Sequence, residues 1–302
     1  MINIVGKRKI YYSFSISLAV LSLIAILAWG LNFGIDFTGG SLMEIEFAGE
    51  TPQADAIKEK LASVGITEST AQPAGEKGFL IRFKDIDEDT HQKILASLNS
   101  LSPVEEKSFE SVGPVIGQEL KDRAYSAVGL VLVLILVYIA FAFRKVSRLI
   151  TSWKYGVAAL LALFHDILIP TGIFAVLGHF AGAQADLLFV TGLLTILGFS
   201  VHDTIVVFDR IRENLRKGAG SNFEDTVNIS VNQTLARSIN TSFTTLLALF
   251  AIYIWGGESI KSFILLLIMG IFFGTYSSIF VASSILVTWE NWRRKKLANK
   301  FS

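Results

Sequence analysis

The residue in this chain best suited to chemistry is an aspartate, Asp203, inside an otherwise apolar stretch. It lies in the segment Gly-Phe-Ser-Val-His-Asp-Thr-Ile-Val-Val-Phe-Asp-Arg-Ile-Arg-Glu-Asn, residues 198–214. Hydrocarbon does not solvate a carboxylate, and insertion scales place its cost near the centre of a span at about 2.5–3.5 kcal/mol. The residue therefore indicates an ion or proton site that faces the interior of a helix bundle. The alternative is a fixed, buried hydrogen bond.

Three more polar residues in apolar stretches extend this candidate site. Asp166 lies near the middle of an earlier apolar stretch, His165 precedes it, and His202 precedes Asp203. Asp166 is either a second relay group or a local partner of Thr171 or His165. Histidine titrates near neutral pH and can pass protons, although an interior histidine such as His165 is more often a satisfied packing residue.

Composition and its distribution predict six transmembrane helices. Of the 302 residues, 52% are hydrophobic, and the mean hydropathy is +0.53. About 20 apolar residues cross the ~30 Å hydrocarbon core. Charge-free runs of that length are residues 10–35, 124–143, 238–257 and 262–289, and the stretches 155–177 and 187–208 each carry a single aspartate. The first run exceeds the roughly 7–15 apolar residues of a signal peptide, so we expect a retained helix.

Lysine and arginine predict the orientation, because cytoplasmic loops carry an excess of both. The short loops on one side of the membrane, near residues 179–186 and 256–261, contain a single basic residue, Lys261, whereas the loops on the other side are rich in them. The clustered basic residues are Lys7, Arg8, Lys9, Arg144, Lys145, Arg148, Lys154, Arg210, Arg212, Arg216, Lys217, Arg237, Arg293, Arg294, Lys295, Lys296 and Lys300. We therefore expect this side to be cytoplasmic, with both chain termini inside.

These spans divide the chain into four expected parts. Residues 1–31 form a cytoplasmic N-terminus and the first helix, residues 32–123 an extracytoplasmic domain, and residues 291–302 a basic cytoplasmic tail. Residues 124–290 form the other five helices, with a cytoplasmic loop at about 209–237. The outer domain carries 9 basic and 17 acidic residues, a formal charge of −8.

The periodicity of residues 32–123 is that of a small α+β domain. Alternating apolar residues predict strands at 41–47, 78–83 and 104–111, and amphipathic patterns predict helices at 52–64 and 87–101. A turn is expected at Pro73–Gly75. The expected architecture is a small sheet with helices on one face, placed between the first and second membrane helices.

Three motifs in fixed order identify a family resemblance. They are Gly34-Ile-Asp-Phe-Thr-Gly-Gly40 after the first span, the Asp203 segment, and Asn232-Gln-Thr-Leu-Ala-Arg-Ser-Ile-Asn-Thr-Ser242 at the fifth span. On a six-span layout, this combination resembles the SecF proteins of the SecD/SecF family, within the resistance-nodulation-division superfamily. The resemblance covers essentially the whole chain.

The resemblance implies a role in bacterial protein export. It implies a multi-pass subunit of the cytoplasmic (inner) membrane that pairs with SecD, acts beside the SecYEG channel and uses the proton-motive force to draw preproteins across. Lipid and, by the same resemblance, YajC are further expected partners, and nucleic acid is not. The family's proton-pathway positions fall by motif on Asp203 and Arg237. An asparagine usually precedes the key aspartate, whereas His202 stands there in this chain.

Physical reasoning supports a switch at these two residues. Asp203 lies about 9 Å along the helix from Asp209, at ~1.5 Å per residue, in the inner half of the membrane. A nearby guanidinium favours the charged carboxylate, so Arg237 is a candidate partner that protonation of Asp203 would release. Arg237 is alternatively a positively charged anchor at a span terminus.

The turn at Asp36, Gly39 and Gly40 has two compatible interpretations. Two glycines permit backbone conformations with positive φ, and Asp36 can accept hydrogen bonds from nearby amides. The turn is then a tight exit from helix to strand. It is also a candidate hinge that carries membrane motion into the outer domain.

Missing motifs narrow the function further. The chain has no cysteine, no G-x-x-x-x-G-K-[ST] loop and no H-E-x-x-H pair, so we expect no metal, no cofactor and no enzymatic activity. An ion gradient is the expected energy source, and the sequence does not distinguish protons from sodium ions. The alternative function is a half-transporter of the same superfamily that exports a small molecule or lipid, and a passive scaffold is the third.

Overall fold

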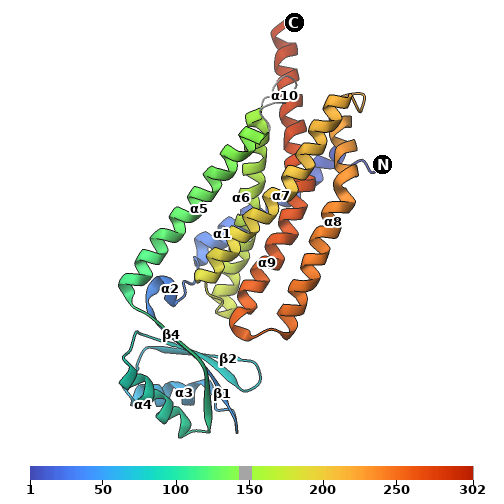
Figure 1. Cartoon of the computed structure of the whole chain (residues 1–302). Coiled ribbons are helices and arrows are strands. Elements are labelled where there is room, and N and C mark those ends of the chain that lie inside the picture. The colour runs from blue at the N-terminus through green and yellow to red at the C-terminus, as the bar shows by residue number, and fades with distance from the viewer. Residues whose placement is uncertain (143–151, 302) are drawn as a thin grey trace. The chain divides into compact units, whose positions relative to one another are not determined.

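The computed structural model describes residues 1–142 and 152–301 and contains two compact units (Figure 1). The helical unit comprises Met1–Gly30, Ala127–His179 and Phe189–Ser302, and the sheet unit comprises Leu31–Ser126 and Phe180–Leu188. Arg144, Lys145 and Arg148, which entered the orientation prediction, lie outside the described residues, as does the side chain of Lys300.

Within the described ranges, six helices are long and apolar enough to cross a membrane, as the sequence predicts. The first five are α1 (Arg8–Trp29, after the 3-10 turn η1, Val5–Lys7), α5 (Pro114–Ala142), α6 (Ser152–Ala181), α7 (Leu187–Lys217) and α8 (Phe223–Trp255). The last is one long helix, composed of α9 (Glu258–Tyr276), the π-helical segment η3 (Ser277–Ala282) and α10 (Ser283–Phe301).

Several helices extend well beyond their charge-free runs. Helix α5 begins at Pro114, ten residues before the apolar run, because proline is favoured in the first helical position and the charged turns pair internally. Arg123 contacts Glu119 at 2.5 Å. The expected loop at 209–237 is likewise mostly helical, and only residues 218–222 separate α7 from α8.

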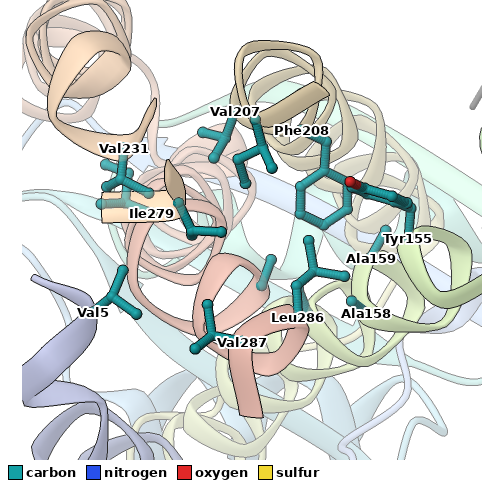
Figure 2. Packing of buried hydrophobic residues seen from close by; sticks show 14 of the residues in the cluster. Val5, Tyr155, Ala158, Ala159, Val207, Phe208, Val231, Ile279, Leu286 and Val287 are labelled. Carbon is teal, nitrogen blue, oxygen red and sulfur yellow. The ribbon is translucent and has the colours of Figure 1, made fainter. Parts of the chain in front are cut away.

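The apolar core of the helical unit lies next to Asp203, on the C-terminal side of that residue along α7. Tyr155 of α6 packs edge to face against Phe208 of α7, with ring centroids 5.2 Å apart, and Leu286 of α10 belongs to the same cluster (Figure 2). Val207 is fully buried there, one helical turn after Asp203. A close-packed apolar layer therefore begins one turn from the carboxylate.

The sheet unit has four antiparallel strands in the order β2-β3-β1-β4. They are β1 (Gly40–Phe47), β2 (Ser69–Ala74), β3 (Gly78–Phe83) and β4 (Val104–Val112). Helices α3 (Ala54–Ser63) and α4 (Glu88–Asn99) cover one face, where their apolar side chains share a core with Met43, Ile45 and Ile81 (Figure 1). The expected α+β pattern is present, with one strand more than predicted.

The additional strand explains one wrong prediction. Pro73 was expected in a turn, but it lies within β2 and pairs with Phe79. Proline lacks an N–H donor, so within sheets it is found mainly at edges, and β2 is an edge strand. The turn of the β2–β3 hairpin lies between Ala74 and Gly78, so it includes Gly75 of the predicted turn but not Pro73.

Helix α4 shows how local sequence fixes an element in this unit. Asp87 precedes the helix, and its carboxylate accepts a hydrogen bond from the Thr90 amide at 3.0 Å. Hydrogen bonding from Thr90 lowers the pKa of Asp87, so the cap is charged at neutral pH. A negative charge at a helix N-terminus also complements the helix dipole.

Candidate functional site in the helix bundle

Asp203 lies on the buried face of α7, where side chains recur at helical spacing. Ser200, Asp203, Val207 and Ile211 are all buried, at intervals of three and four residues. Asp203 is 8% exposed. The sequence-based expectation that it faces the bundle interior is therefore met by its position.

The two oxygens of the Asp203 carboxyl group have different surroundings. Oδ1 accepts a hydrogen bond from Ser238 Oγ of α8 at 2.5 Å. Oδ2 is buried, and no hydrogen-bond partner for it exists in the part of the chain that the structure describes. A buried polar atom without a partner is unusual in a native structure and calls for an explanation. A proton on the carboxyl group would remove its charge and so lower the cost of leaving Oδ2 unpaired.

Arg237 does not form the expected ion pair with Asp203. Within residues 1–142 and 152–296, no ion pair joins them, and the Arg237 side chain is exposed. Arg237 instead lines a pocket of about 250 Å³ between α7 and α8, together with Ile205, Val206, Asp209, Arg210, Glu213, Gln233 and Thr234. The reason is helical phase, because successive residues point about 100° apart and Ser238 takes the inward direction.

His202 also points away from the candidate site. Its side chain is exposed, whereas Asp203 and Thr204 are buried. The histidine that replaces the usual asparagine therefore makes no hydrogen bond to Asp203 among the described residues. Its expected part in the proton pathway receives no support from this geometry.

Asp166 forms a second buried carboxylate cluster. It is fully buried, and its Oδ2 accepts hydrogen bonds from Ser200 Oγ at 2.5 Å and from Ser277 Oγ at 2.7 Å. His165 Nδ1 lies 2.9 Å from Oδ1. The interpretation of His165 as a local partner agrees with this contact. Thr171 does not bond Asp166 in the described chain, since its buried hydroxyl has no partner there.

Hydroxyl groups of the last span connect the two carboxylate sites. Thr204 Oγ1 and Ser278 Oγ are 2.7 Å apart, and Ser278 Oγ donates to the Ser200 carbonyl oxygen at 3.3 Å. Ser277 and Ser278 both belong to η3. Sequence reasoning missed them, although adjacent serines in a long apolar run were a visible signal.

The motif at the fifth span has two structural roles. Its first residue, Asn232, accepts a hydrogen bond from the Ile2 amide at 2.9 Å and so holds the N-terminal segment against α8. Its seventh residue, Ser238, contacts Asp203. The motif was singled out for Arg237, and the residue that touches the carboxylate is the next one along.

Within the sheet unit, the Asp36 turn is held by groups distant in sequence. Asp36 Oδ2 accepts a hydrogen bond from the amide of Leu187, the first residue of α7, at 2.7 Å. The sequence predicted a nearby amide instead. The Gly34 amide also donates to the Ala185 carbonyl at 2.9 Å.

The two glycines of this turn are required by its geometry. Gly39 has φ 74° and Gly40 has φ 129°, a region that favours glycine. A Cβ atom on Gly39 would lie 2.7 Å from the Cα of Pro114, and one on Gly40 would lie 2.9 Å from the Phe83 carbonyl oxygen. The expected tight exit from helix to strand is present.

Six apolar helices, a small sheet and two buried carboxylates served by serine hydroxyls together define a multi-pass membrane protein with interior titratable groups. Residues 91–292 match the family "Protein export membrane protein SecD/SecF, C-terminal", and residues 24–49 match the family "SecD/SecF GG Motif". The latter contains the Asp36–Gly40 turn. The chain belongs to the SecD/SecF family, as the three motifs predict.

Similar proteins extend this match over nearly the whole chain. Protein translocase subunit SecF of Thermobaculum terrenum is 45% identical over 96% of this chain and 95% of that protein. The SecF subunit of Anaerolinea thermophila is 42% identical over 97% and 96%. The crystal structure of SecDF, a translocon-associated membrane protein from Thermus thermophilus, superposes with a TM-score of 0.84 at 34% identity. That match covers 96% of this chain and 39% of the SecDF chain.

Proposed function

We propose that this chain is a SecF-type subunit of the bacterial protein-export machinery that couples the proton-motive force to preprotein movement. It acts in the cytoplasmic membrane with a SecD-like partner, beside SecYEG and with YajC as an auxiliary component. Its sheet unit lies outside and both termini lie in the cytoplasm. It performs no covalent chemistry on its substrate and uses no cofactor.

Family membership supports the role in export. The curated relatives that match at similar length are translocase subunits, and this favours export over a small-molecule half-transporter. The SecDF chain is more than twice as long as its matching part. A separate SecD-like protein would supply the rest of such an assembly.

The observation that carries the energy-coupling part is the Asp203 carboxyl group. It is buried in the helical unit, and one oxygen accepts from Ser238 while the other has no partner in the described chain. Serine both donates and accepts, so the contact persists whether Asp203 is charged or neutral. Asp203 can therefore change protonation state without losing its place in the bundle.

Arg237 supplies the second state of the proposed switch. Arg237 and Ser238 are neighbours on α8, so a small rotation of α8 brings the Arg237 guanidinium toward Asp203. Neutral Asp203 needs only the Ser238 contact, whereas charged Asp203 also attracts the guanidinium from the neighbouring pocket. One charge moving through 100 mV provides about 2.3 kcal/mol, enough to bias such an equilibrium strongly.

A vesicle translocation assay tests this function. Inverted membrane vesicles containing the SecD-like partner and either the wild-type chain or Asp203→Asn are given a preprotein, with and without a proton gradient. The wild type is expected to respond to the gradient and Asp203→Asn is not. Asp122→Asn is the control, because Asp122 is an exposed aspartate of α5 outside the Arg237 pocket, and it should behave as wild type. Equal gradient responses of wild type and Asp203→Asn would refute proton coupling through Asp203.

A further inference from the structure

Asp166 has the features of an acid that gains and loses a proton, although the switch described above does not use it. Its carboxyl group is fully buried and contacts three polar side chains from three segments, Ser200 of α7, Ser277 of η3 and His165 beside it. Within the described chain, no lysine or arginine forms an ion pair with it. The negative charge can therefore be offset only by a proton, held on Asp166 or on His165.

His165 offers a place for that proton. Its Nδ1 faces Asp166 at 2.9 Å, while its Nε2 is buried with no hydrogen-bond partner among the described residues. A neutral imidazole beside a carboxylate has a net charge of −1, and one added proton makes the pair neutral. Burial in an apolar medium favours the neutral form. The pair is thus able to take up a single proton without a third charged group.

The other side chains packed around Asp166 and His165 do not offset the negative charge of the pair. Tyr276 of α9 stacks on the His165 ring with centroids 6.2 Å apart. Its hydroxyl donates to the Tyr11 carbonyl at 3.2 Å, and Ser15 Oγ lies 3.4 Å away. Phe273 covers another side of the imidazole. Among the described residues, the side chains that contact this pair are therefore uncharged ones, Ser200, Ser277, Phe273 and Tyr276.

Segment η3 connects the pair to Asp203. Ser277 Oγ bonds Asp166, and the next residue, Ser278, bonds both the Ser200 carbonyl and the Thr204 hydroxyl. Thr204 follows Asp203 directly. The Ser277 hydroxyl also lies 3.1 Å from the Gly274 carbonyl, a second acceptor. It can therefore leave Asp166 when that residue is neutral, without becoming an unpaired buried donor. Single π-helical turns often occur at functional sites.

We propose that Asp166 and His165 form a second proton-holding site of the same chain, coupled to Asp203 by Ser277 and Ser278 of the π-helical segment. This proposal rests on the proposed proton-driven function and adds a second protonation event to it. Loss of a proton from the Asp166 pair recruits Ser277 from Gly274 to Asp166. The accompanying movement of η3 shifts Ser278 against Thr204 and so reaches the turn of α7 that carries Asp203.

Infrared difference spectroscopy between acidic and alkaline buffer tests the proposal, because a protonated carboxyl group has its own C=O band. The sample is the full chain with its SecD-like partner in lipid vesicles. The wild type is expected to show two such pH-dependent bands, one lost in Asp166→Asn and the other in Asp203→Asn. Ser277→Ala should raise the pH at which the Asp166 band is lost, because the charged form of Asp166 then lacks a hydrogen-bond donor. Thr195→Ala should change neither, since its hydroxyl bonds only the Thr191 carbonyl.

The same variants in the translocation assay separate the two proposals. Loss of the gradient response in both Asp166→Asn and Asp203→Asn supports two coupled sites. Loss in Asp203→Asn alone, with no pH-dependent band assigned to Asp166, overturns this inference and leaves the proposed function standing. A wild type without gradient response refutes the proposed function itself. If Asp166→Asn fails to assemble, the pH dependence of the Asp166 band in Ser277→Ala decides, and an unchanged pH dependence overturns the inference.

Discussion

Serine hydroxyls, and no lysine or arginine, contact Asp203 and Asp166 in the described helical unit. Ser238 contacts Asp203, and Ser200 and Ser277 contact Asp166. An arginine in contact would favour the charged carboxylate at all times. A hydroxyl can donate to a carboxylate or accept from a carboxylic acid. Serine partners are therefore the side chains expected where protonation must be reversible.

Ser238→Ala tests whether this hydroxyl supports the charged state of Asp203. A hydrogen bond to a charged group contributes about 1.5–3 kcal/mol, so the deprotonated form should become roughly 10- to 100-fold less populated at a given pH. Gradient-dependent translocation should fall accordingly, and Ser238→Thr, which keeps the hydroxyl, should retain most of it. Full activity of Ser238→Ala would show that the contact is only structural.

Arg237 can be separated from a simple membrane anchor by two substitutions. If Arg237 only marks the cytoplasmic end of the span, Arg237→Lys should preserve gradient-dependent translocation completely. If its guanidinium approaches Asp203 in the charged state, Arg237→Lys should be impaired because lysine is a point charge without the planar fork. Arg237→Gln should then abolish the response. Translocation is measured at equal membrane abundance, and an unimpaired Arg237→Lys would favour the anchor.

At this scale the sequence predicts which residues are titratable but not what they touch. Asp203 and Asp166 are recognisable because each interrupts an apolar run. The partner of Asp203 depends on the rotation of α8 about its own axis, which turns Ser238 inward and Arg237 outward. A motif that contains both residues does not encode that rotation. The partner of Asp36 is 151 positions away in the sequence, and the sequence does not predict it either.

Among the elements, the turn at Gly39 and Gly40 has the most exacting geometry. Its first glycine combines a positive φ with a close approach to the start of α5, at Pro114. Few residue types satisfy both conditions, which explains why this turn contains glycines. The turn also precedes β1, the strand with neighbours on both sides at the centre of the sheet.

Gly39→Ala and Gly75→Ala form a matched pair for this turn. Both glycines have nearly the same φ, 74° and 73°, but nothing lies within 4 Å of a Cβ at Gly75. A positive φ disfavours alanine at both positions, and only Gly39→Ala adds a clash with Pro114. Thermal unfolding in detergent should show a larger loss of stability for Gly39→Ala. Equal losses would mean that the turn relaxes around the added methyl group.

The elements themselves were largely predictable from pattern. Long apolar runs identify six spans because nothing else requires about 20 such residues in succession. The ends of these helices were harder to predict, since charged turns such as Glu119–Arg123 continue a helix through ion pairs within it. Strand β2 was missed because Pro73 is a breaker by composition but tolerated at a sheet edge.

At the scale of the whole molecule, the helices differ greatly in how much of their apolar surface is covered. Only 6% of the apolar window of α5 is buried, against 67% for the last helix. Lipid or a partner protein must cover the remainder in the membrane. The match to 39% of a SecDF chain leaves ample further sequence in such an assembly to provide cover.

The proposed orientation can be tested because the chain contains no cysteine. Glu76→Cys places a thiol in the β2–β3 turn, and Ser221→Cys places one between α7 and α8, both at exposed positions. A membrane-impermeant maleimide should label Glu76→Cys in intact spheroplasts and Ser221→Cys only in inverted vesicles. The reverse pattern would place the sheet unit in the cytoplasm and contradict the positive-inside prediction.

The central claim is that Asp203 takes up and releases protons in response to a gradient. The most direct measurement is proton flux in liposomes that contain the chain with its SecD-like partner and a pH-sensitive dye. A pH gradient should decay through the wild-type assembly and through Asp122→Asn, and it should persist with Asp203→Asn at equal reconstitution. Decay at the wild-type rate with Asp203→Asn would contradict the claim.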